Sequence, residues 1–318
     1  LAPFVAWGHP YRAYWLAGAL TTFFIFWAGR ELAGNGVGLL AGLIVALSPG
    51  MAIFSNLLLA HHPTLVGLSA FLFFFLRMQR TRSFRDALLA GVGLAFGMLC
   101  RPMTAAGFAL PFGIWLGVEV VRWCLPRVNH KATDSATEKS VVPQITGLAI
   151  PLACGLIGLF FYNQSITDSG WKMPYQLYTD LYTPRHVYGF DNVVRGEQKL
   201  GPKVLENYDK WAENLTPALA AQNVQNRLLA SLQWTLGLVP LLLAGLLFLI
   251  TECRRWSRWW LIYASIISLH VVHIPYWYDG IMHWHYVFET GPLWALIFVR
   301  VTQTLFGIWS DLERPLMS

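Results

Sequence analysis

Apolar residues occur in long runs along most of the chain, and short polar segments separate these runs. A helix needs about 20 apolar residues to cross the hydrocarbon core of a bilayer. Measured against this length, the runs predict about nine membrane-spanning helices, several of them short. The predicted helices cover residues 13–29, 37–49, 57–76, 87–101, 103–121, 145–162, 228–250, 260–276 and 287–306. The pattern therefore predicts an all-α polytopic membrane protein.

One polar stretch, residues 163–227, is long enough to form a region of its own. Its first half is rich in turn-forming residues and predicts a loop, whereas residues 201–227 have the pattern of an amphipathic helix. We expect this stretch to lie on the membrane surface as an outward-facing lid. The chain then divides into transmembrane helices over 1–162, the extracytoplasmic loop or lid over 163–227, and C-terminal transmembrane helices over 228–318.

Composition supports a location in the membrane. Of the 318 residues, 55% are hydrophobic and only 13% are charged, whereas about a quarter of an ordinary soluble protein is charged. A soluble single-domain enzyme is therefore excluded. The cysteines show no metal-ligand or paired spacing and lie in or beside apolar runs, which argues against a disulfide-bonded ectodomain. They are Cys100, Cys124, Cys154 and Cys253.

The basic residues indicate how the chain is oriented. Short loops that carry Lys and Arg are retained on the cytoplasmic side of a membrane. Three alternate loops are rich in these residues: Arg77, Arg80, Arg82 and Arg85; Arg122, Arg127, Lys131 and Lys139; Arg254, Arg255 and Arg258. All three lie on one side if the odd-numbered spans run inward. The formal net charge of +6 is thus a signal of topology, and no nucleic-acid partner is expected.

Arg101 is the strongest candidate for a functional residue. It follows an apolar run and precedes Pro102, so the sequence predicts a guanidinium at a turn on the outer boundary of the membrane. Charged groups at membrane depth are costly and are therefore candidates for function. A guanidinium can bind a phosphate with two parallel hydrogen bonds. The alternative is an arginine that only extends its charged end to the interface.

Two groups of histidines lie in outward-facing segments. His61 and His62 are adjacent, so they point about 100° apart on a helix and cannot chelate one metal together as an i, i+4 pair can. Hydrogen bonds to a sugar or a phosphate are one interpretation, and a helix terminus at the interface is the other. The second group, in residues 270–289, combines four histidines with two carboxylates, Asp279 and Glu289, and several aromatic residues.

The second group has the composition of a sugar-binding surface. Flat aromatic rings stack on sugars, and His283, His285 and the carboxylates can bond hydroxyl groups. A divalent metal is an alternative ligand, although no zinc-binding spacing is present. An aromatic belt at the membrane interface, with polar groups already satisfied, is a further alternative.

The long polar stretch contains tyrosines interleaved with cations. Lys172, Tyr175, Arg185 and His186 lie in this part of the sequence. Such residues can bind a glycan or a phosphate, and they are equally typical of an ordinary folded surface loop.

Several segments of the sequence are similar to one known superfamily. In the first half they are the run Gly38-Leu-Leu-Ala-Gly-Leu-Ile-Val-Ala-Leu-Ser-Pro49, then His61, the Arg-rich hairpin, and Leu99-Cys-Arg101-Pro102-Met-Thr104. Later segments are Met173-Pro-Tyr-Gln-Leu-Tyr178, Leu236-Gly-Leu-Val-Pro240 and His285-Tyr-Val-Phe-Glu289-Thr-Gly-Pro292. Together they resemble GT-C membrane glycosyltransferases of the protein O-mannosyltransferase and lipid A aminoarabinose transferase type, in its bacterial branch.

The resemblance implies a transferase that moves a hexose or pentose from a polyprenyl-phosphate donor to a hydroxyl group of a glycan, lipid or protein. The active face would be extracytoplasmic, on a bacterial inner or plasma membrane of the cell envelope. Arg101, helped by His61 or His62, would bind the donor phosphate. In such enzymes the main acidic residue lies in the first outward loop. The resemblance implies that residues 1–12 are the tail of that loop, and that this carboxylate lies upstream of Leu1 in an N-terminally incomplete chain.

Within the chain, Asp279 and Glu289 are then the carboxylates placed to assist, as contacts to the acceptor or to a metal. Two other functions are alternatives to the transferase. A transporter or flippase for a lipid-linked or anionic solute would require polar residues that face each other near the middle of the membrane, whereas nearly all the charges lie at the ends of the spans. A non-catalytic remnant of the GT-C fold is the third hypothesis.

Overall fold

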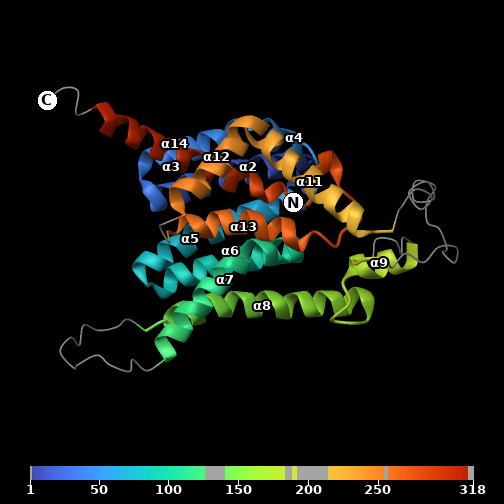
Figure 1. Cartoon of the computed structure of the whole chain (residues 1–318). Helices are drawn as coiled ribbons and strands as arrows, with labels where there is room; N and C mark the ends of the chain where they lie inside the picture. The colour runs from blue at the N-terminus through green and yellow to red at the C-terminus, as the bar shows by residue number, and fades with distance from the viewer. Residues whose placement is uncertain (1, 126–139, 183–187, 192–213, 254–256, 314–318) are drawn as a thin grey trace.

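The computed structural model describes residues 2–125, 140–182, 188–191, 214–253 and 257–313. Over these ranges the secondary structure is helical, and none of the described residues forms a strand. Most of the long helices lie side by side with their axes roughly aligned (Figure 1). The prediction of an all-α protein is confirmed.

The helices have the following bounds. They are α1 (Ala2–Ala6), α2 (Pro10–Ala33), α3 (Asn35–Leu47), α4 (Pro49–Phe54), α5 (His61–Thr81), α6 (Phe84–Cys100), α7 (Pro102–Cys124), α8 (Val142–Thr167), α9 (Pro174–Tyr182), α11 (Pro217–Thr235), α12 (Leu238–Glu252), α13 (Trp259–Val272) and α14 (Gly291–Glu313). Two short 3₁₀ turns, η2 (Ile281–His283) and η3 (Phe288–Thr290), precede α14.

One apolar run does not form a single helix. Residues 228–250 were expected to form one span, but α11 ends at Thr235 and α12 begins at Leu238, with a bend of 106° between them. Gly237 lies in the break with a φ of 122°. Residues other than glycine rarely adopt this conformation, so the prediction of one straight helix here is wrong. The other apolar runs each fall mainly on one helix.

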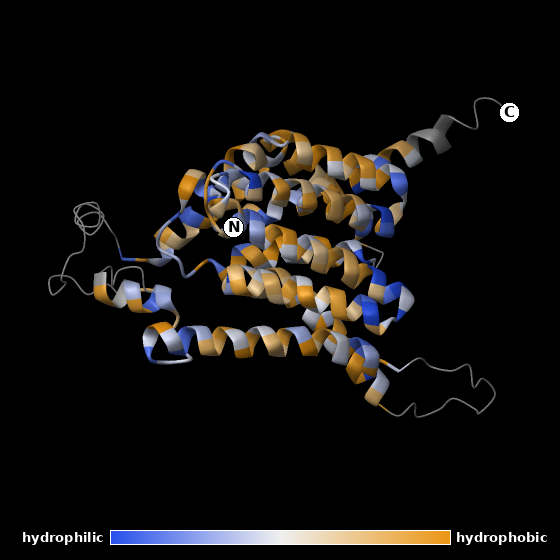
Figure 2. Cartoon of the chain, turned by 180° about the vertical axis from the view of Figure 1, so that it is seen from behind, coloured by the Kyte–Doolittle hydropathy of each residue, from blue (hydrophilic) through white to orange (hydrophobic). Residues whose placement is uncertain are grey.

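Among the described residues, two helices are each long and apolar enough to cross a membrane: α7 and α8. The bent pair α11 and α12 would make a third span if the two helices act together. Apolar residues cover the sides of the helices, as the orange colour in Figure 2 shows. These features are those of a membrane protein. That about nine segments span the membrane stays a prediction.

Helix α5 lies at the centre of the packing and contacts α2 and α6 extensively. Its buried face includes Phe71 and Phe75, whose rings pack edge-on against Phe112 of α7. The approach to α6 is close because two glycines face each other. A Cβ atom added to Gly67 would lie 2.6 Å from the carbonyl oxygen of Gly93, so a larger residue cannot fit without moving a helix.

The polar stretch 163–227 contains the end of α8, the short helix α9 and the first half of α11. Residues 192–213 lie outside the described residues. Within the described part of the amphipathic helix expected over 201–227, α11 begins at Pro217 and continues through the predicted boundary at residue 228. Asn223 and Arg227 of α11 are buried. This part of α11 therefore belongs to the packed bundle, and a lid formed by the rest of the stretch stays a prediction.

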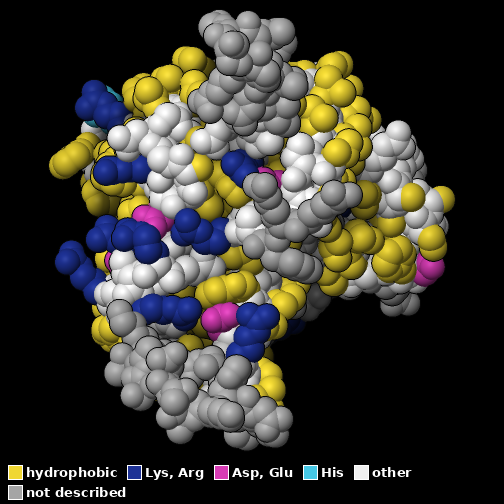
Figure 3. Space-filling view, turned by 60° about the vertical axis from the view of Figure 1, so that its left-hand side comes forward, with side chains coloured by type: hydrophobic (Ala, Val, Ile, Leu, Met, Phe, Trp, Pro, Cys, Tyr) yellow, Lys and Arg dark blue, Asp and Glu magenta, His cyan; other side chains and the backbone are white. Residues whose placement is uncertain are grey.

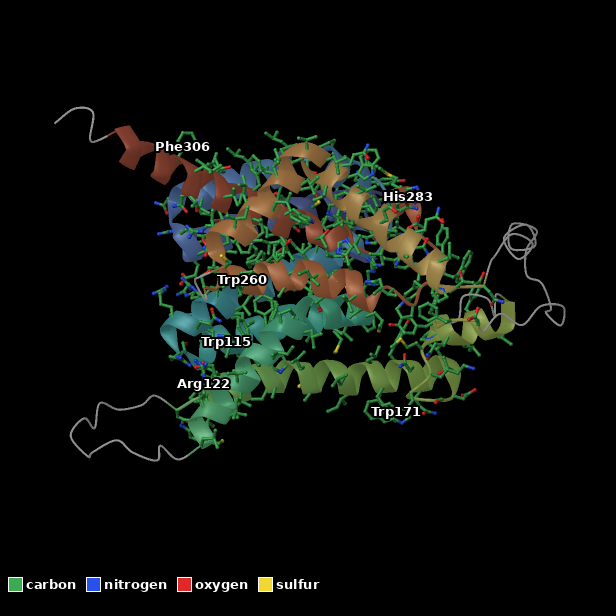
Figure 4. The ribbon with its side chains drawn as sticks, in the orientation of Figure 1. Trp115, Arg122, Trp171, Trp260, His283 and Phe306 are labelled. Carbon is green, nitrogen blue, oxygen red and sulfur yellow. The ribbon has the colours of Figure 1, made fainter. Side chains whose placement is uncertain are left out.

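The described arginines of the predicted cytoplasmic loops gather at one end of the bundle, which we call the basic end. They are Arg77, Arg80, Arg82, Arg85, Arg122 and Arg258. Figure 3 shows them as dark blue groups on this face. Arg122 and Trp260 mark the same end in Figure 4, whereas His283 and Trp171 lie at the opposite end. The described parts of the loops that the sequence assigned to one side of the membrane therefore lie together in the structure.

Ion pairs connect the helices at the basic end. Arg80 of α5 donates to Glu31 of α2 at 2.6 Å, and a nitrogen of Arg258 donates to the backbone carbonyl of Glu31 at 3.1 Å. The most buried pair joins α12 to α14, where Nε of Arg300 donates to Glu252 at 2.9 Å. The side chain of Glu252 is only 2% exposed. These contacts fix the ends of helices whose remaining contacts are largely apolar.

We expect Glu252→Gln to lower the free energy of unfolding by roughly 2–3 kcal/mol, because it leaves the guanidinium of Arg300 without its counter-charge. The matched control is Arg80→Gln, which removes an ion pair whose arginine is mostly exposed, and its effect should be smaller. Denaturant unfolding in detergent micelles measures both. Equal midpoints for the two variants would contradict the structural role of the buried pair.

Candidate functional site

Arg101 lies between two helices that follow each other without a loop. Helix α6 ends at Cys100, and Pro102 begins α7. A proline disfavours the α-helical conformation in the residue before it, and Arg101 accordingly has a φ of −149° and a ψ of 88°. The break brings its guanidinium to the end of the bundle where α5 begins, opposite the basic end.

Three side chains surround this guanidinium, and the four residues are called the Arg101 cluster: His61, Arg101, His285 and Glu289. Nη1 of Arg101 donates to Oε1 of Glu289 at 2.9 Å and to the backbone oxygen of His285 at 3.2 Å. The same nitrogen contacts Nδ1 of His61. The side chain of Glu289 is fully buried, and that of Arg101 is 14% exposed. The Arg101 cluster therefore joins the start of α5, the junction of α6 with α7 and the segment before α14.

The two histidines of the cluster are linked through their rings, with Nε2 of His61 at 3.2 Å from Nδ1 of His285. Because Nδ1 of His61 faces an N–H of Arg101, we infer that it accepts there and that Nε2 carries the proton donated to His285. Burial above all, together with the neighbouring His61 and Arg101, lowers the pKa of His285 from 6.5 to about 3. His285 is therefore neutral near pH 7.

Two nitrogens of Arg101 are left for a ligand. Its bonds to the described residues all leave from Nη1, and none is formed by Nε or Nη2. These two nitrogens present parallel N–H groups, which match two oxygens of a phosphate or carboxylate. Glu289 balances the charge of Arg101 from the buried side and holds the guanidinium in place. The protein therefore holds the guanidinium through Nη1, whereas Nε and Nη2 form no hydrogen bond to the described residues.

An aromatic layer supports the cluster from inside the bundle. The rings of Phe54 and Phe288 stack with centroids 4.6 Å apart, and Trp284 packs edge-on against Phe288 at 4.9 Å. Trp284 also lies against Gly50, where an added Cβ would come within 2.3 Å of the indole ring. The segment 284–289 is thus packed against α4, which fixes the position of Glu289.

A buried arginine holds the loop formed by residues 273–290. Arg227 of α11 is fully buried, and it donates to three backbone carbonyls of this loop. The acceptors are His273 at 2.6 Å, Tyr276 at 3.1 Å and Tyr278 at 2.8 Å. Asn223, one turn earlier on α11, donates to the carbonyl of Trp277 at 2.8 Å. The loop that carries His285 is therefore fixed to α11 by its own backbone.

Asp279 and His283 form a second polar pair on the same loop. Nδ1 of His283 bonds Oδ2 of Asp279, and Asn226 donates to the same oxygen at 2.9 Å. Oδ1 of Asp279 lies 3.7 Å from Nε of Arg227. The side chain of Asp279 is 17% exposed, whereas that of His283 is 59% exposed. The predicted carboxylates are thus separated: Glu289 lies in the Arg101 cluster, and Asp279 pairs with His283.

Other candidates from the sequence lie outside the Arg101 cluster. His62 is buried, and its Nε2 contacts the carbonyl of Met51 at 3.2 Å, so it forms none of the bonds to Arg101. Lys172 lies just before α9, at the turn that follows α8. Arg185 and His186 lie outside the described residues.

Tyr175, on α9, lies beside the 273–290 loop. It is 51% exposed overall. Burial of its phenol group above all, together with the neighbouring Tyr276, nevertheless raises the pKa of Tyr175 to about 12. The structure therefore brings this candidate close to the loop without bringing it into the Arg101 cluster.

Arg227 and Asn223 were not among the residues singled out from the sequence. They lie four residues apart, which places them on one face of a helix. The spacing could have indicated that the two side chains act together. Both residues, however, lie in the stretch that was expected to lie on the membrane surface. A buried role in holding a loop was therefore not anticipated.

The described residues provide no complete metal site. No group of three or more His, Cys, Asp or Glu side chains among them has a suitable arrangement. His61, His285 and Glu289 come closest to one another, but they surround the guanidinium of Arg101. This positive group would repel a cation at that position. The alternative of a divalent metal therefore does not fit the described part of the Arg101 cluster.

The low pKa of His285 predicts a pH dependence of stability. An unfolded chain binds a proton at this histidine below pH 6.5, whereas the folded chain does so only near pH 3. Stability is therefore lost as the pH falls from about 6.5 toward 3, by up to about 2 kcal/mol at pH 5. We expect His285→Gln to lose less stability than the wild type between pH 7 and pH 5. Denaturant unfolding at the two pH values tests this, and identical losses would contradict it.

Comparison with known protein families gives a match over part of the chain. A family model described as dolichyl-phosphate-mannose-protein mannosyltransferase matches residues 11–130. This range contains α2 to α7, and with them His61 and Arg101, but not His285 or Glu289. Searches of curated proteins and of solved structures found no match. The resemblance to GT-C mannosyltransferases is thus confirmed over residues 11–130, which points to a membrane glycosyltransferase.

Proposed function

We propose that this protein transfers a sugar from a polyprenyl-phosphate donor to an acceptor hydroxyl on the extracytoplasmic face of a membrane. The family match supports sugar transfer by a membrane protein. The transferred unit would be a hexose or pentose, and the acceptor a glycan, a lipid or a protein. The membrane would be a bacterial inner or plasma membrane.

The observation that carries the proposal is that Arg101 bonds the described residues through Nη1 alone. Transfer breaks the bond between the anomeric carbon of the sugar and an oxygen of the phosphate, and the bonding electrons leave with the phosphate. The departing group therefore gains negative charge. Preorganised donors that face such charge stabilise the transition state. Nε and Nη2 of Arg101 are positioned to supply these donors, because Glu289 and the carbonyl of His285 hold the guanidinium through Nη1.

The position of the cluster in the bundle supports an extracytoplasmic site. The described arginines of the predicted cytoplasmic loops, Arg122 among them, lie at the basic end, and His283 lies at the opposite end (Figure 4). Loops rich in Lys and Arg remain on the cytoplasmic side. A lipid-linked donor in the outer leaflet would then present its phosphate at the depth of the junction between α6 and α7.

A reconstituted assay tests this function. The full-length chain is placed in proteoliposomes with dolichyl-phosphate mannose that carries a radiolabelled mannose, and a peptide rich in serine and threonine is added outside. We expect label on the peptide and release of dolichyl phosphate. Movement of intact donor between leaflets without cleavage would instead indicate a flippase, and would overturn the proposal.

A further inference from the structure

Two arginines from different helices share one carboxylate at the basic end. Glu31, near the end of α2, accepts from Nε of Arg80 at 2.6 Å and from its Nη2 at 3.1 Å. Arg258, just before α13, lies 3.9 Å from the same carboxylate and donates to the backbone oxygen of Glu31 at 3.1 Å. The single negative charge of Glu31 therefore balances only one of the two guanidinium groups.

The carboxylate is more deeply covered than the two arginines. The side chain of Glu31 is 11% exposed, whereas those of Arg80 and Arg258 are 61% and 36% exposed. Asp86, a further carboxylate at this end, is 7% exposed and pairs with Arg77 at 3.4 Å. Figure 3 shows basic side chains beside hydrophobic ones on this face. The outer surface around Glu31 is therefore positively charged.

Arg30 adds a third guanidinium. It is exposed and lies in the last turn of α2, next to Glu31. Its guanidinium lies over the ring of Trp27, 4.5 Å from the centroid, and no carboxylate in the described part of the chain pairs with it. We call Arg30, Glu31, Arg80 and Arg258 the Glu31 group. Its positive charges outnumber its negative charge, and Arg30 is the member without an ionic partner among the described residues.

An apolar row leads to Arg30 along the outer face of α2. Leu16, Leu20 and Phe23 are 49%, 38% and 51% exposed, and Trp27 follows them. Spacings of three and four residues place these side chains on one face of the helix. The ring of Phe23 packs edge-on against Trp27 with centroids 6.1 Å apart. The helix rises by about 21 Å between Leu16 and Arg30.

The row and the charge at its end match the parts of a phospholipid. One leaflet contributes about 15 Å of hydrocarbon, half the thickness of the bilayer core, so the row is long enough to lie along an acyl chain. Tryptophan is typical of the level of the headgroups, and Trp27 is fixed there by Phe73 of α5, with ring centroids 5.9 Å apart. The guanidinium above it can bind a phosphate with two parallel hydrogen bonds.

We propose that the Glu31 group binds an anionic glycerophospholipid from the leaflet at the basic end. The phosphate lies on Arg30, and one acyl chain lies along the row from Leu16 to Trp27. Arg80 and Arg258 favour a negatively charged lipid over a zwitterionic one, because Glu31 balances only one of them. Basic groups between membrane helices bind anionic headgroups in this way. The site lies at the end of the bundle opposite the Arg101 cluster, so it does not depend on the proposed sugar transfer.

Native mass spectrometry of the full-length chain released from detergent micelles tests this site. Phosphatidylglycerol and phosphatidylcholine with identical acyl chains are added, and the dissociation constant of each is measured. We expect the wild type to bind phosphatidylglycerol at least about tenfold more tightly. Arg30→Gln should weaken this binding about fivefold, the equivalent of the roughly 1 kcal/mol that one arginine contributes near an anionic membrane, and should leave phosphatidylcholine unaffected.

Two further variants separate a lipid site from a structural cluster of charges. Glu31→Gln removes the negative charge of the group and should strengthen the binding of phosphatidylglycerol about fivefold, which a purely structural role would not produce. Arg122→Gln is the matched control, because it removes an exposed arginine from the same end, where Glu119 already pairs with it. We expect no change in this variant.

Three results would overturn the proposal. The first is equal affinity of the wild type for the two lipids. The second is equal weakening in Arg30→Gln and Arg122→Gln, which would show only a general attraction of the basic end for negative charge. The third is displacement of phosphatidylglycerol by inorganic phosphate at the same concentration, which would show an anion site without a contribution from the apolar row.

Discussion

Replacing Arg101 with glutamine is expected to lower the turnover of sugar transfer by about 10²–10³-fold, the usual cost of removing one donor that faces developing charge. The variant loses the two N–H groups of Nε and Nη2 that would face the departing phosphate. The rate of mannose transfer from dolichyl-phosphate mannose measures the effect. The matched control is Arg85→Gln, since Arg85 lies in the first turn of the same helix, at its basic end.

The glutamine also leaves Glu289 buried without its counter-charge, so the loss of activity has to be separated from a loss of folding. Glu289→Gln combined with Arg101→Gln removes both charges and should restore much of the stability, because an isolated buried charge costs more than a missing ion pair. We expect the double variant to stay folded and to remain inactive. Recovery of transfer in the double variant would show that Arg101 acts only as the partner of Glu289.

Replacing Arg227 with methionine is expected to lower the free energy of unfolding by about 3–5 kcal/mol, because each buried acceptor left without a donor costs about 1–3 kcal/mol. Arg227 is fully buried, and methionine leaves three backbone carbonyls of the 273–290 loop without their donor. Asp279 also loses its neighbouring cation. Denaturant unfolding in micelles measures the change.

An exposed arginine provides the control for Arg227. Arg122 pairs with Glu119 on the same helix, and its side chain is 73% exposed. Arg122→Met should cost less than about 1 kcal/mol, because exposed ion pairs contribute little. Similar losses in the two variants would contradict the role of Arg227 as the anchor of the loop. A stable Arg227→Met variant that retains sugar transfer would contradict it more strongly.

The helices could be predicted from the sequence because their signals are local. Apolar runs mark the bundle, and the pairing of Arg101 with Pro102 marks the break between α6 and α7, since proline restricts the residue before it. The bend at Gly237 was missed because the apolar run continues across the glycine without a polar interruption. The positive φ of Gly237 changes the direction of the chain, but the glycine leaves the hydropathy of the run unchanged.

The composition of the site could be predicted only in part. Arg101, His61, His285 and Glu289 were each candidates, because polar groups in apolar surroundings stand out in the sequence. Their contacts could not be derived, since 228 positions separate His61 from Glu289. Such pairing depends on how α5, α7 and α14 pack. Arg227 was missed for the opposite reason, because its surroundings in the sequence are polar and its burial comes only from the fold.

The inhibition of sugar transfer by dolichyl phosphate, the leaving group itself, tests the central claim most directly. Arg101→Lys keeps the positive charge beside Glu289 but loses the parallel N–H groups, since a lysine cannot form the planar fork. We expect this variant to weaken the inhibition constant at least about tenfold, equivalent to roughly 1.4 kcal/mol, while Arg85→Lys leaves it unchanged. Equal inhibition constants for the wild type and both variants would contradict the assignment of Arg101 to the phosphate of the donor.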